Sequence, residues 1–173
     1  VSQRKYGGLF HTSELGVQVA LLYQRFLYSF FLLKNTKVLL LDFDNTLWDG
    51  VMAEGDVAHY VDRQKLLFEI QKGGVMLAAV SKNSPENIRW TEMFLARSAF
   101  VAEKISWNAK VDSIKELAQE LNLGLNSFVF IDDNHHERAM VENELPEVVC
   151  LDATLMSTWE SLEQILSMPV TAT

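Results

Sequence analysis

Two aspartates two residues apart, Asp42 and Asp44, follow the apolar run Val38–Leu41. A short continuous apolar run is typical of a strand that is buried on both faces of a parallel sheet. Residues i and i+2 at the end of a strand can point to the same side, so both carboxylates can serve one site. Carboxylates are preferred ligands of Mg²⁺, and they can also attack phosphorus or transfer protons. The motif therefore indicates phosphoryl chemistry, with Asp42 as nucleophile or metal ligand and Asp44 as general acid and base.

A second apolar run, Val75–Val80, ends at Ser81, Lys82 and Asn83. A hydroxyl group and backbone N–H groups at a strand end can hold phosphate oxygens. Lys110 precedes a predicted helix and offers a cation for the phosphate and for the charge of the nucleophile. The side chains and backbone at Ser81–Asn83, together with Lys110, are therefore predicted to bind phosphate.

A third run, Phe128–Ile131, ends at Asp132 and Asp133, and a fourth, Val148–Leu151, ends at Asp152. The paired acids Asp132 and Asp133 are suited to completing the metal site. Each residue alone also has a structural explanation, because strand-end aspartates often form turns. The combination of acids at several strand ends favours a site that holds a cation.

The runs alternate with helical segments, which predicts an α/β fold: a Rossmann-like three-layer sandwich around a mainly parallel sheet. In such sheets ligands bind at the carboxyl ends of the strands, where the polar residues gather. The helices are expected at about Asp62–Gln71, Pro85–Ala96, Val111–Leu121, Glu137–Asn143 and Ser157–Leu166.

The composition is that of one soluble globular domain, with 173 residues, 49% of them hydrophobic and 22% charged. The formal net charge of -8 disfavours nucleic acid as a partner, since phosphate backbones attract basic surfaces. The single cysteine, Cys150, cannot form a disulfide within the chain, and a cytoplasmic location is expected.

The segment Leu15–Leu33 is rich in apolar residues, but Gln18, Gln24 and Arg25 interrupt it, so a membrane span is not expected. We expect a helix that packs on the domain or on a missing neighbour. The predicted organisation is an N-terminal arm and helix at 1–36 and a catalytic domain at 37–173.

In chain order these motifs resemble those of the haloacid dehalogenase (HAD) superfamily: DxDxT after the first strand, then Ser, then Lys, then paired acids. The resemblance covers about Lys37 to Leu151 and implies the HAD fold with a Mg²⁺ cofactor. Only 38 residues separate Asp44 from Lys82, and 28 separate Lys82 from Lys110, which leaves no room for a cap domain. The matching residues are Asp42, Asp44, Thr46, Ser81, Lys110, Asp132 and Asp133.

Longer stretches resemble the FkbH-like branch of that superfamily, namely Asp42–Trp48 followed by Gly50-Val51, then Ser81–Asn83, Ser106–Lys110, Leu121–Asn134 and Glu137-Arg138. This resemblance implies a phosphatase and acyltransferase domain of a multidomain polyketide synthase. It would take an acyl phosphate, 1,3-bisphosphoglycerate, and load a glyceryl unit onto the phosphopantetheine thiol of an acyl carrier protein.

The resemblance also implies roles for the matched residues. Mg²⁺ would bind through Asp42, Asp132 and the carbonyl of Asp44. Phosphate binding is implied for Thr46, Ser81, Lys82, Asn83 and Lys110, and support of the metal ligands for Asp133, Asn134, Glu137 and Arg138.

Two departures from the branch are visible. The cysteine that usually precedes Ser-Lys-Asn is Val80 here, which excludes an acyl-enzyme on that thiol, and the segment Gly50–Gln64 is shorter than usual. A capless magnesium-dependent phosphatase without acyl transfer, or a carrier-docking domain with altered activity, are the alternatives. An acidic carrier would need a local basic patch, for which Lys82, Arg89, Arg97 and Lys104 are candidates; an ordinary solvated surface is the alternative.

Overall fold

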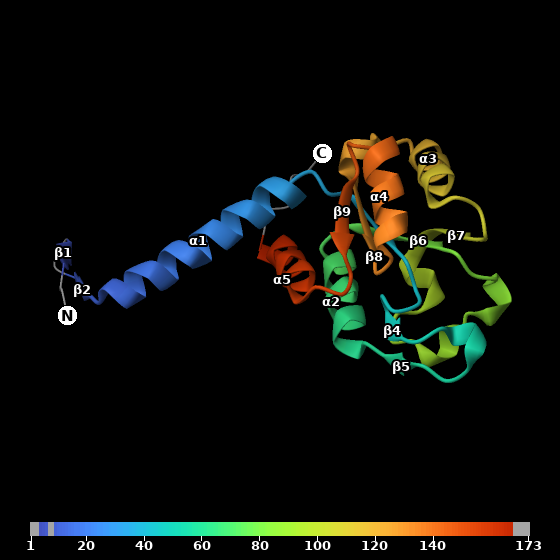
Figure 1. Ribbon diagram of the computed structural model, residues 1–173, viewed down its shortest axis with the longest axis horizontal. Coiled ribbons are helices and arrows are strands. Elements are labelled where there is room, and N and C mark those ends of the chain that lie inside the picture. Colours follow the sequence, from blue (N-terminus) through green and yellow to red (C-terminus); the bar gives the residue numbers. More distant parts are fainter. Residues whose placement is uncertain (1–3, 7–8, 168–173) are drawn as a thin grey trace.

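The computed structural model describes residues 4–6 and 9–167 and contains a central sheet of five parallel strands (Figure 1). The strand order is β7-β6-β3-β8-β9, so the first strand of the core, β3, lies in the middle. Every neighbouring pair in this sheet is parallel. The strands are β3 (Val38–Leu41), β6 (Met76–Ser81), β7 (Phe100–Ile105), β8 (Phe128–Asp132) and β9 (Val149–Asp152).

Helices cover both faces of the sheet, which gives the three layers that the sequence predicted. Along β3, Leu39 and Leu41 face the layer of α2 and α5, whereas Val38 and Leu40 face the layer of α3 and α4. All four side chains are fully buried, as expected for a strand that is covered on both sides. The helices are α2 (Val61–Lys72), α3 (Lys110–Glu120), α4 (His135–Glu144) and α5 (Met156–Glu163).

The segment from 42 to 60 forms a small antiparallel ribbon at the carboxyl edge of the sheet. Strands β4 (Trp48–Asp49) and β5 (Ala58–His59) pair there, and a 3-10 turn, Met52–Glu54, lies between them. The backbone N–H of Tyr60 donates to the Leu47 carbonyl at 3.0 Å and closes the ribbon before α2.

The helix that was predicted over Pro85–Ala96 is wrong. Three short 3-10 turns, Pro85–Asn87, Trp90–Glu92 and Arg97–Ala99, occupy this region instead. The reason is tertiary: the amides of Phe94 and Leu95 both donate to the buried Gln64 side chain, at 2.8 and 3.2 Å, rather than to carbonyls four residues earlier. Strand β7, for which the sequence pattern offered no clear signal, follows directly.

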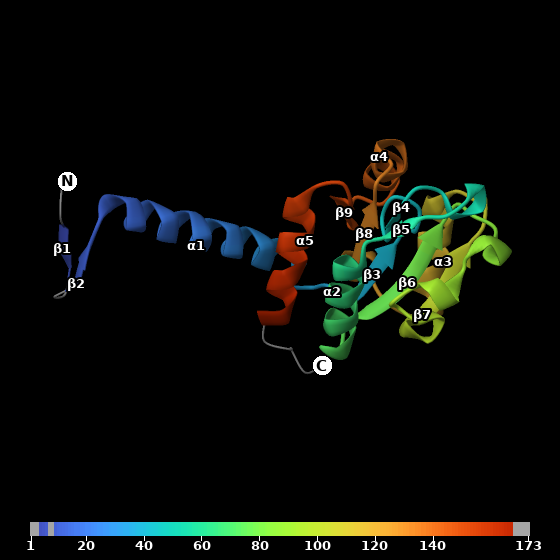
Figure 2. The ribbon, with the colours of Figure 1, turned by 90° about the horizontal axis from the view of Figure 1, so that it is seen from below.

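Helix α1 (Ser13–Leu33) projects away from the core (Figures 1 and 2). Its N-cap is Thr12, whose hydroxyl accepts from the Leu15 amide at 3.2 Å. Only its C-terminal end, with the buried side chains of Ser29 and Leu33, packs on the core, where α1 contacts α5. A short hairpin of β1 (Arg4–Tyr6) and β2 (Leu9–His11) precedes the helix.

Most apolar side chains of α1 are exposed. By length and composition the helix could cross a membrane, which is weak evidence because signal sequences and core helices satisfy the same criterion. The exposed large apolar residues are Leu15, Val17, Val19, Leu21, Leu22, Tyr23, Phe26, Leu27, Tyr28 and Phe31.

Candidate active site

Two buried aspartates and one buried lysine meet at the carboxyl edge of the sheet. Asp42 follows β3, Asp132 ends β8, and Lys110 begins α3. The Lys110 Nζ atom lies 2.8 Å from Asp42 Oδ1 and 2.5 Å from Asp132 Oδ2. The parallel register that pairs Leu41 with Ile131 brings both acids to the same edge. The sequence motifs therefore converge in space as predicted.

The charges in this triad do not balance. Burial raises the pKa of Asp42 and of Asp132, although the Lys110 charge opposes the shift in each case. Burial acts to lower the pKa of Lys110, but the two carboxylates outweigh it and the pKa is raised overall. Two carboxylates against one ammonium leave an excess negative charge where desolvation is costly, so a bound cation would stabilise the site.

A group of three carboxylates could hold that cation. Oxygen atoms of Asp42, Asp132 and Asp133 all lie within 4.8 Å of one another, the one such group of acids found in the described part of the chain. Burial and the neighbouring Asp132 charge raise the pKa of Asp133. An all-oxygen donor set fits a hard cation such as Mg²⁺. Asp133 is thus placed as a direct candidate ligand, in keeping with the paired acids of the motif, whereas the family resemblance implied only a supporting role for it.

The Asp44 carboxylate lies outside this group and is held by three donors. Its Oδ1 atom accepts from Trp48 Nε1 at 2.8 Å and from the Met52 amide at 3.0 Å, and its Oδ2 accepts from Asn83 Nδ2 at 3.0 Å. These contacts fix a carboxylate that lines the cavity next to Asp42. The arrangement suits a proton-transfer group whose position is set by the ribbon.

Ser81 at the end of β6 and the two residues after it have different roles. The buried Ser81 side chain hydrogen-bonds to Asp42 and lines the cavity. Asn83 holds Asp44 and also accepts from the Ser84 amide at 2.8 Å, so it positions the acid rather than lining the cavity. Lys82 extends across to α4, where its Nζ atom lies 2.6 Å from Glu137 Oε1.

Thr46 was predicted to bind phosphate, but the structure places it away from the cavity wall. Its side chain is fully buried, and its hydroxyl has no hydrogen-bond partner among the described residues. Its carbonyl accepts from Arg63 Nη1 at 2.9 Å. The tight turn after Asp44 directs this side chain inward, a consequence of backbone geometry that a motif match does not reveal.

The loop after β8 is fixed by α4. The Asn134 amide donates to Asp132 Oδ1 at 2.7 Å, and Arg138 Nη1 donates to the Asp132 carbonyl at 2.8 Å. Arg138 also pairs with Asp152 at 2.5 Å. Glu137 contacts Lys82 instead of this loop, because successive residues of a helix point in different directions.

Asn45 is a site residue that sequence reasoning missed. Its side chain hydrogen-bonds to Asp133, and its Oδ1 atom accepts from the Gly50 amide at 3.0 Å. Its φ angle of 56° lies in the left-handed region, where asparagine is more readily accommodated than most residues. The position of an Asn directly after the second motif aspartate, Asp44, is the signal that could have found it.

A cavity of about 180 Å³ opens between these groups. Four acids and two lysines contribute to its wall, so it is a polar site suited to a charged ligand. The lining residues are Asp42, Asp44, Asn45, Ser81, Lys82, Lys110, Asp133, Asn134 and Glu137.

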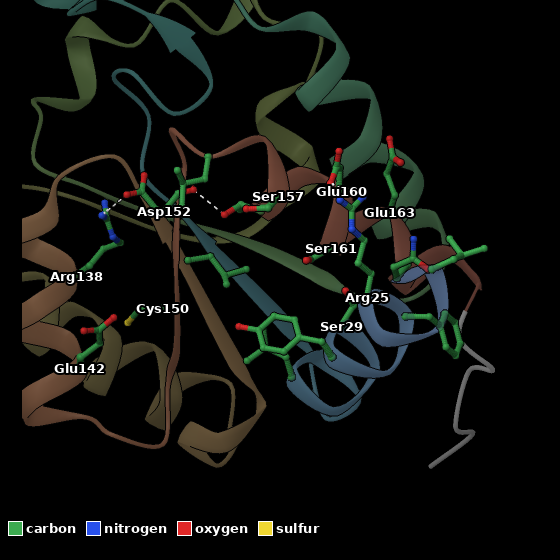
Figure 3. Close-up of a pocket in the computed structure, with 18 of the residues that line it drawn as sticks. Arg25, Ser29, Arg138, Glu142, Cys150, Asp152, Ser157, Glu160, Ser161 and Glu163 are labelled. Carbon is green, nitrogen blue, oxygen red and sulfur yellow. Dashed lines mark hydrogen bonds and ion pairs between the residues drawn. The ribbon is translucent and has the colours of Figure 1, made fainter. Parts of the chain in front are cut away.

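A larger groove of about 620 Å³ lies elsewhere, between α1 and the elements α4, β9 and α5 (Figure 3). Cys150 and Glu142 lie on one side of it and Arg25 on the other, while the Arg138–Asp152 pair lies at one end. Burial raises the pKa of Cys150 to about 12, so its thiol is not a ready nucleophile. Four acids line this groove as well (Glu142, Asp152, Glu160 and Glu163), but among the described residues they are not part of a group close enough to hold a metal ion.

Position 80 offers no substitute thiol. Val80 is fully buried and packs in the cluster on the α3 and α4 side of the sheet. Ser81, the next residue, faces the cavity, as the alternation along a strand requires. Neither Val80 nor Cys150 therefore provides an acyl-carrying group at the carboxylates.

The four basic residues considered for carrier binding all have carboxylate partners. Their positive charge is compensated locally, which weakens any basic patch. The pairs are Lys82 with Glu137, Arg89 with Glu92, Arg97 with Glu103, and Lys104 with Glu116 and Glu120.

Comparison with known proteins identifies the fold. No family model matches the chain, and no curated protein matches it. Among solved structures, the N-terminal part of a Bacteroides fragilis protein, which contains a phosphatase domain and is complexed with Mg, is 29% identical with a TM-score of 0.65. The match covers 75% of this chain and 40% of that one, so this chain spans less than half of the Bacteroides chain.

Two more distant structures agree. The 3-deoxy-D-manno-octulosonate 8-phosphate phosphatase from Moraxella catarrhalis, in complex with magnesium, phosphate and KDO, is 22% identical, with a TM-score of 0.54 and coverage of 66% of this chain and 67% of that one. A Legionella pneumophila protein assigned to the HAD superfamily (subfamily III A) hydrolases is 14% identical, with a TM-score of 0.58 and coverage of 87% and 91%. The chain therefore has the HAD-type α/β fold, which confirms the predicted fold class.

Proposed function

We propose that this chain is a Mg²⁺-dependent phosphatase of the HAD type. The observation that carries the proposal is the contact of Lys110 with both Asp42 and Asp132 beside a small polar cavity. The Bacteroides phosphatase domain, 29% identical and complexed with Mg, supports it. Asp42, Asp132 and Asp133 would hold the ion, which would neutralise and orient phosphoryl oxygens when bound.

Each residue around the cavity then has its own role in the reaction. Asp42 attacks phosphorus, and the bond from phosphorus to the leaving oxygen breaks with its electron pair on that oxygen. Ser81 and Lys110 hold the phosphoryl oxygens, and the Lys110 charge offsets the charge that develops on them. Water then attacks the phosphorus of the aspartyl phosphate, Asp44 takes its proton, and Asp42 is released.

The finer proposal is that the substrate is an acyl phosphate of three carbons, such as 1,3-bisphosphoglycerate, and that the acyl group passes to an acyl carrier protein. The FkbH-like motifs support it. With Val80 buried and the Cys150 pKa raised to about 12, the thiol must come from the carrier. The carrier sulfur would attack the acyl carbon, Asp44 would take the thiol proton, and phosphate would leave with the carbon–oxygen electron pair.

A plain phosphatase is the second candidate, because no side-chain thiol faces the cavity. The two activities differ in the bond that breaks. Acyl transfer breaks the carbon–oxygen bond, whereas attack by Asp42 breaks the phosphorus–oxygen bond.

Intact-protein mass spectrometry of a phosphopantetheinylated carrier, incubated with the chain, Mg²⁺ and 1,3-bisphosphoglycerate generated in place, separates the candidates. A glyceryl-sized gain that is absent with Asp42→Asn and without the chain establishes acyl loading. Phosphate release that depends on Asp42, without any gain on the carrier, establishes the plain phosphatase. Absence of both would contradict the proposed function.

A further inference from the structure

Lys82 is a cation in the wall of the cavity that the proposed reaction leaves unused. It lines the cavity together with Asn134 and Glu137. Lys110 is already engaged by Asp42 and Asp132. Lys82 is the other lysine in the cavity wall, and it touches neither of those acids.

The Lys82 side chain is held, rather than free to move in solvent. Its Nζ atom lies 2.6 Å from Glu137 Oε1, a contact between residues 55 apart in the chain that joins β6 to the first turn of α4. Glu137 is nearly buried, whereas the Lys82 side chain remains about one-third exposed. An ammonium group has three N–H donors, and one contact with Glu137 leaves others for a ligand.

The N-terminus of α4 lies beside Lys82 in the cavity wall. The first turn of α4, a helix of ten residues, borders the cavity through Asn134 and Glu137, and the amide dipoles of a helix N-terminus add positive potential there. The candidate metal ligands Asp42, Asp132 and Asp133 form no ion pair with Lys82. Glu137 balances it in the absence of a ligand.

We propose that Lys82, held by Glu137, forms a subsite for a second anionic group of the substrate, a carboxylate or a phosphate distant from the phosphoryl group at Asp42. This inference rests on the proposed function and narrows its substrate class to compounds with two anionic groups. Glu137 is a positioning residue that acts through Lys82. A single phosphate monoester without a second anion would leave the subsite empty.

Isothermal titration calorimetry in the presence of Mg²⁺ tests the subsite with a matched pair of probes. The compounds 3-phosphoglycerate and glycerol 3-phosphate share a three-carbon phosphate ester, but only the first has a carboxylate. We expect wild type to bind 3-phosphoglycerate about 10-fold more tightly or better, the gain expected from a charge-assisted contact. In Lys82→Met the preference should disappear, and in Lys82→Arg it should persist.

Glu137→Ala should reduce the preference, and Glu137→Gln, which keeps an oxygen acceptor, should restore part of it. The matched control is Lys72→Met, since Lys72 forms a comparable pair with Glu69 at 3.0 Å on the exposed face of α2. Circular dichroism of each variant establishes that it is folded.

The subsite is overturned if wild type does not prefer 3-phosphoglycerate over glycerol 3-phosphate. It is also overturned if the Lys82→Met variant keeps that preference. An equal loss of both probes in Lys82→Met also overturns it, because Lys82 would then hold the phosphate at Asp42. A stronger preference in Glu137→Ala overturns the positioning role. The proposed function is judged separately, by Asp42-dependent phosphate release from acetyl phosphate, which has no second anionic group.

Discussion

The carboxylate site and helix α1 differ in which side chains they bury and which they expose to solvent. At the site, charged groups are buried and paired: Asp132 is fully buried, and Lys110 is 4% exposed between two acids. Along α1, apolar groups are exposed: Leu22 is 66% and Tyr28 65% accessible. Burial of charge and exposure of apolar surface both cost free energy. The core tolerates the first cost because other elements hold each charge, whereas α1 contacts the core only at its C-terminal end.

The largest effect is expected at the site, from Lys110→Met. Removing the ammonium leaves Asp42 and Asp132 buried without compensation, which should cost about 3–5 kcal/mol of stability. Urea unfolding without metal measures it, and added Mg²⁺ should recover part of the loss. Lys115→Met, at an exposed pair with Glu144, is the control. A loss no larger than that of the control would show that the triad is not buried in solution.

The same Leu→Ala truncation, made once in the core and once on α1, tests whether the two regions differ in burial. Leu39→Ala, in the fully buried strand β3, should cost about 2–5 kcal/mol, whereas Leu22→Ala on α1 should change stability by about 0.5 kcal/mol or less. Thermal unfolding of both variants gives the values. A large loss for Leu22→Ala would mean that another surface covers α1 in solution.

Magnesium should stabilise the folded chain through the acids. At a free concentration about 100 times its Kd, Mg²⁺ should add about 2.7 kcal/mol to the free energy of unfolding. Asp133→Asn should weaken this gain at the same Mg²⁺ concentration, because Asp133 is in the candidate ligand group. Asp112→Asn, an exposed acid of α3, should leave it unchanged. Equal gains in the two variants would remove Asp133 from the metal site.

The smallest effect concerns Asp152. Burial acts to raise the pKa of Asp152, but Thr154 and Arg138 outweigh it and hold the pKa below its ordinary value of 3.8. A lowered pKa in the folded state contributes stability above pH 3.8 that is lost as pH falls through the folded pKa. Asp152→Asn should therefore cost about 1 kcal/mol at neutral pH and little in strong acid. A pH series of unfolding curves, with exposed Asp49→Asn as control, measures the difference.

The strands that position the site were predictable because continuous aliphatic runs reflect burial on both faces. The predicted run Val38–Leu41 and the structural β3 coincide, and the other three runs shift by at most one residue at either end. The helix over Pro85–Ala96 was not predictable from local pattern, because the distant Gln64 side chain captures its amides. The site, too, was predictable only in part. Asp42, Ser81, Lys110 and Asp132 meet as predicted, whereas Thr46 does not face the cavity.

The sequence by itself determined the chemical types at the strand ends and the parallel α/β fold that brings them together, because both follow from local pattern and from the connection rules of parallel sheets. The tertiary structure alone decided how the acids divide their work. Packing of the ribbon ties Asp44 to Trp48, and the pairing of β3 with β8 places Asp133 near Asp42. The first turn of α4 reaches the loop after β6, where Glu137 meets Lys82. Such contacts depend on the relative placement of distant elements, which spacing along the chain does not encode.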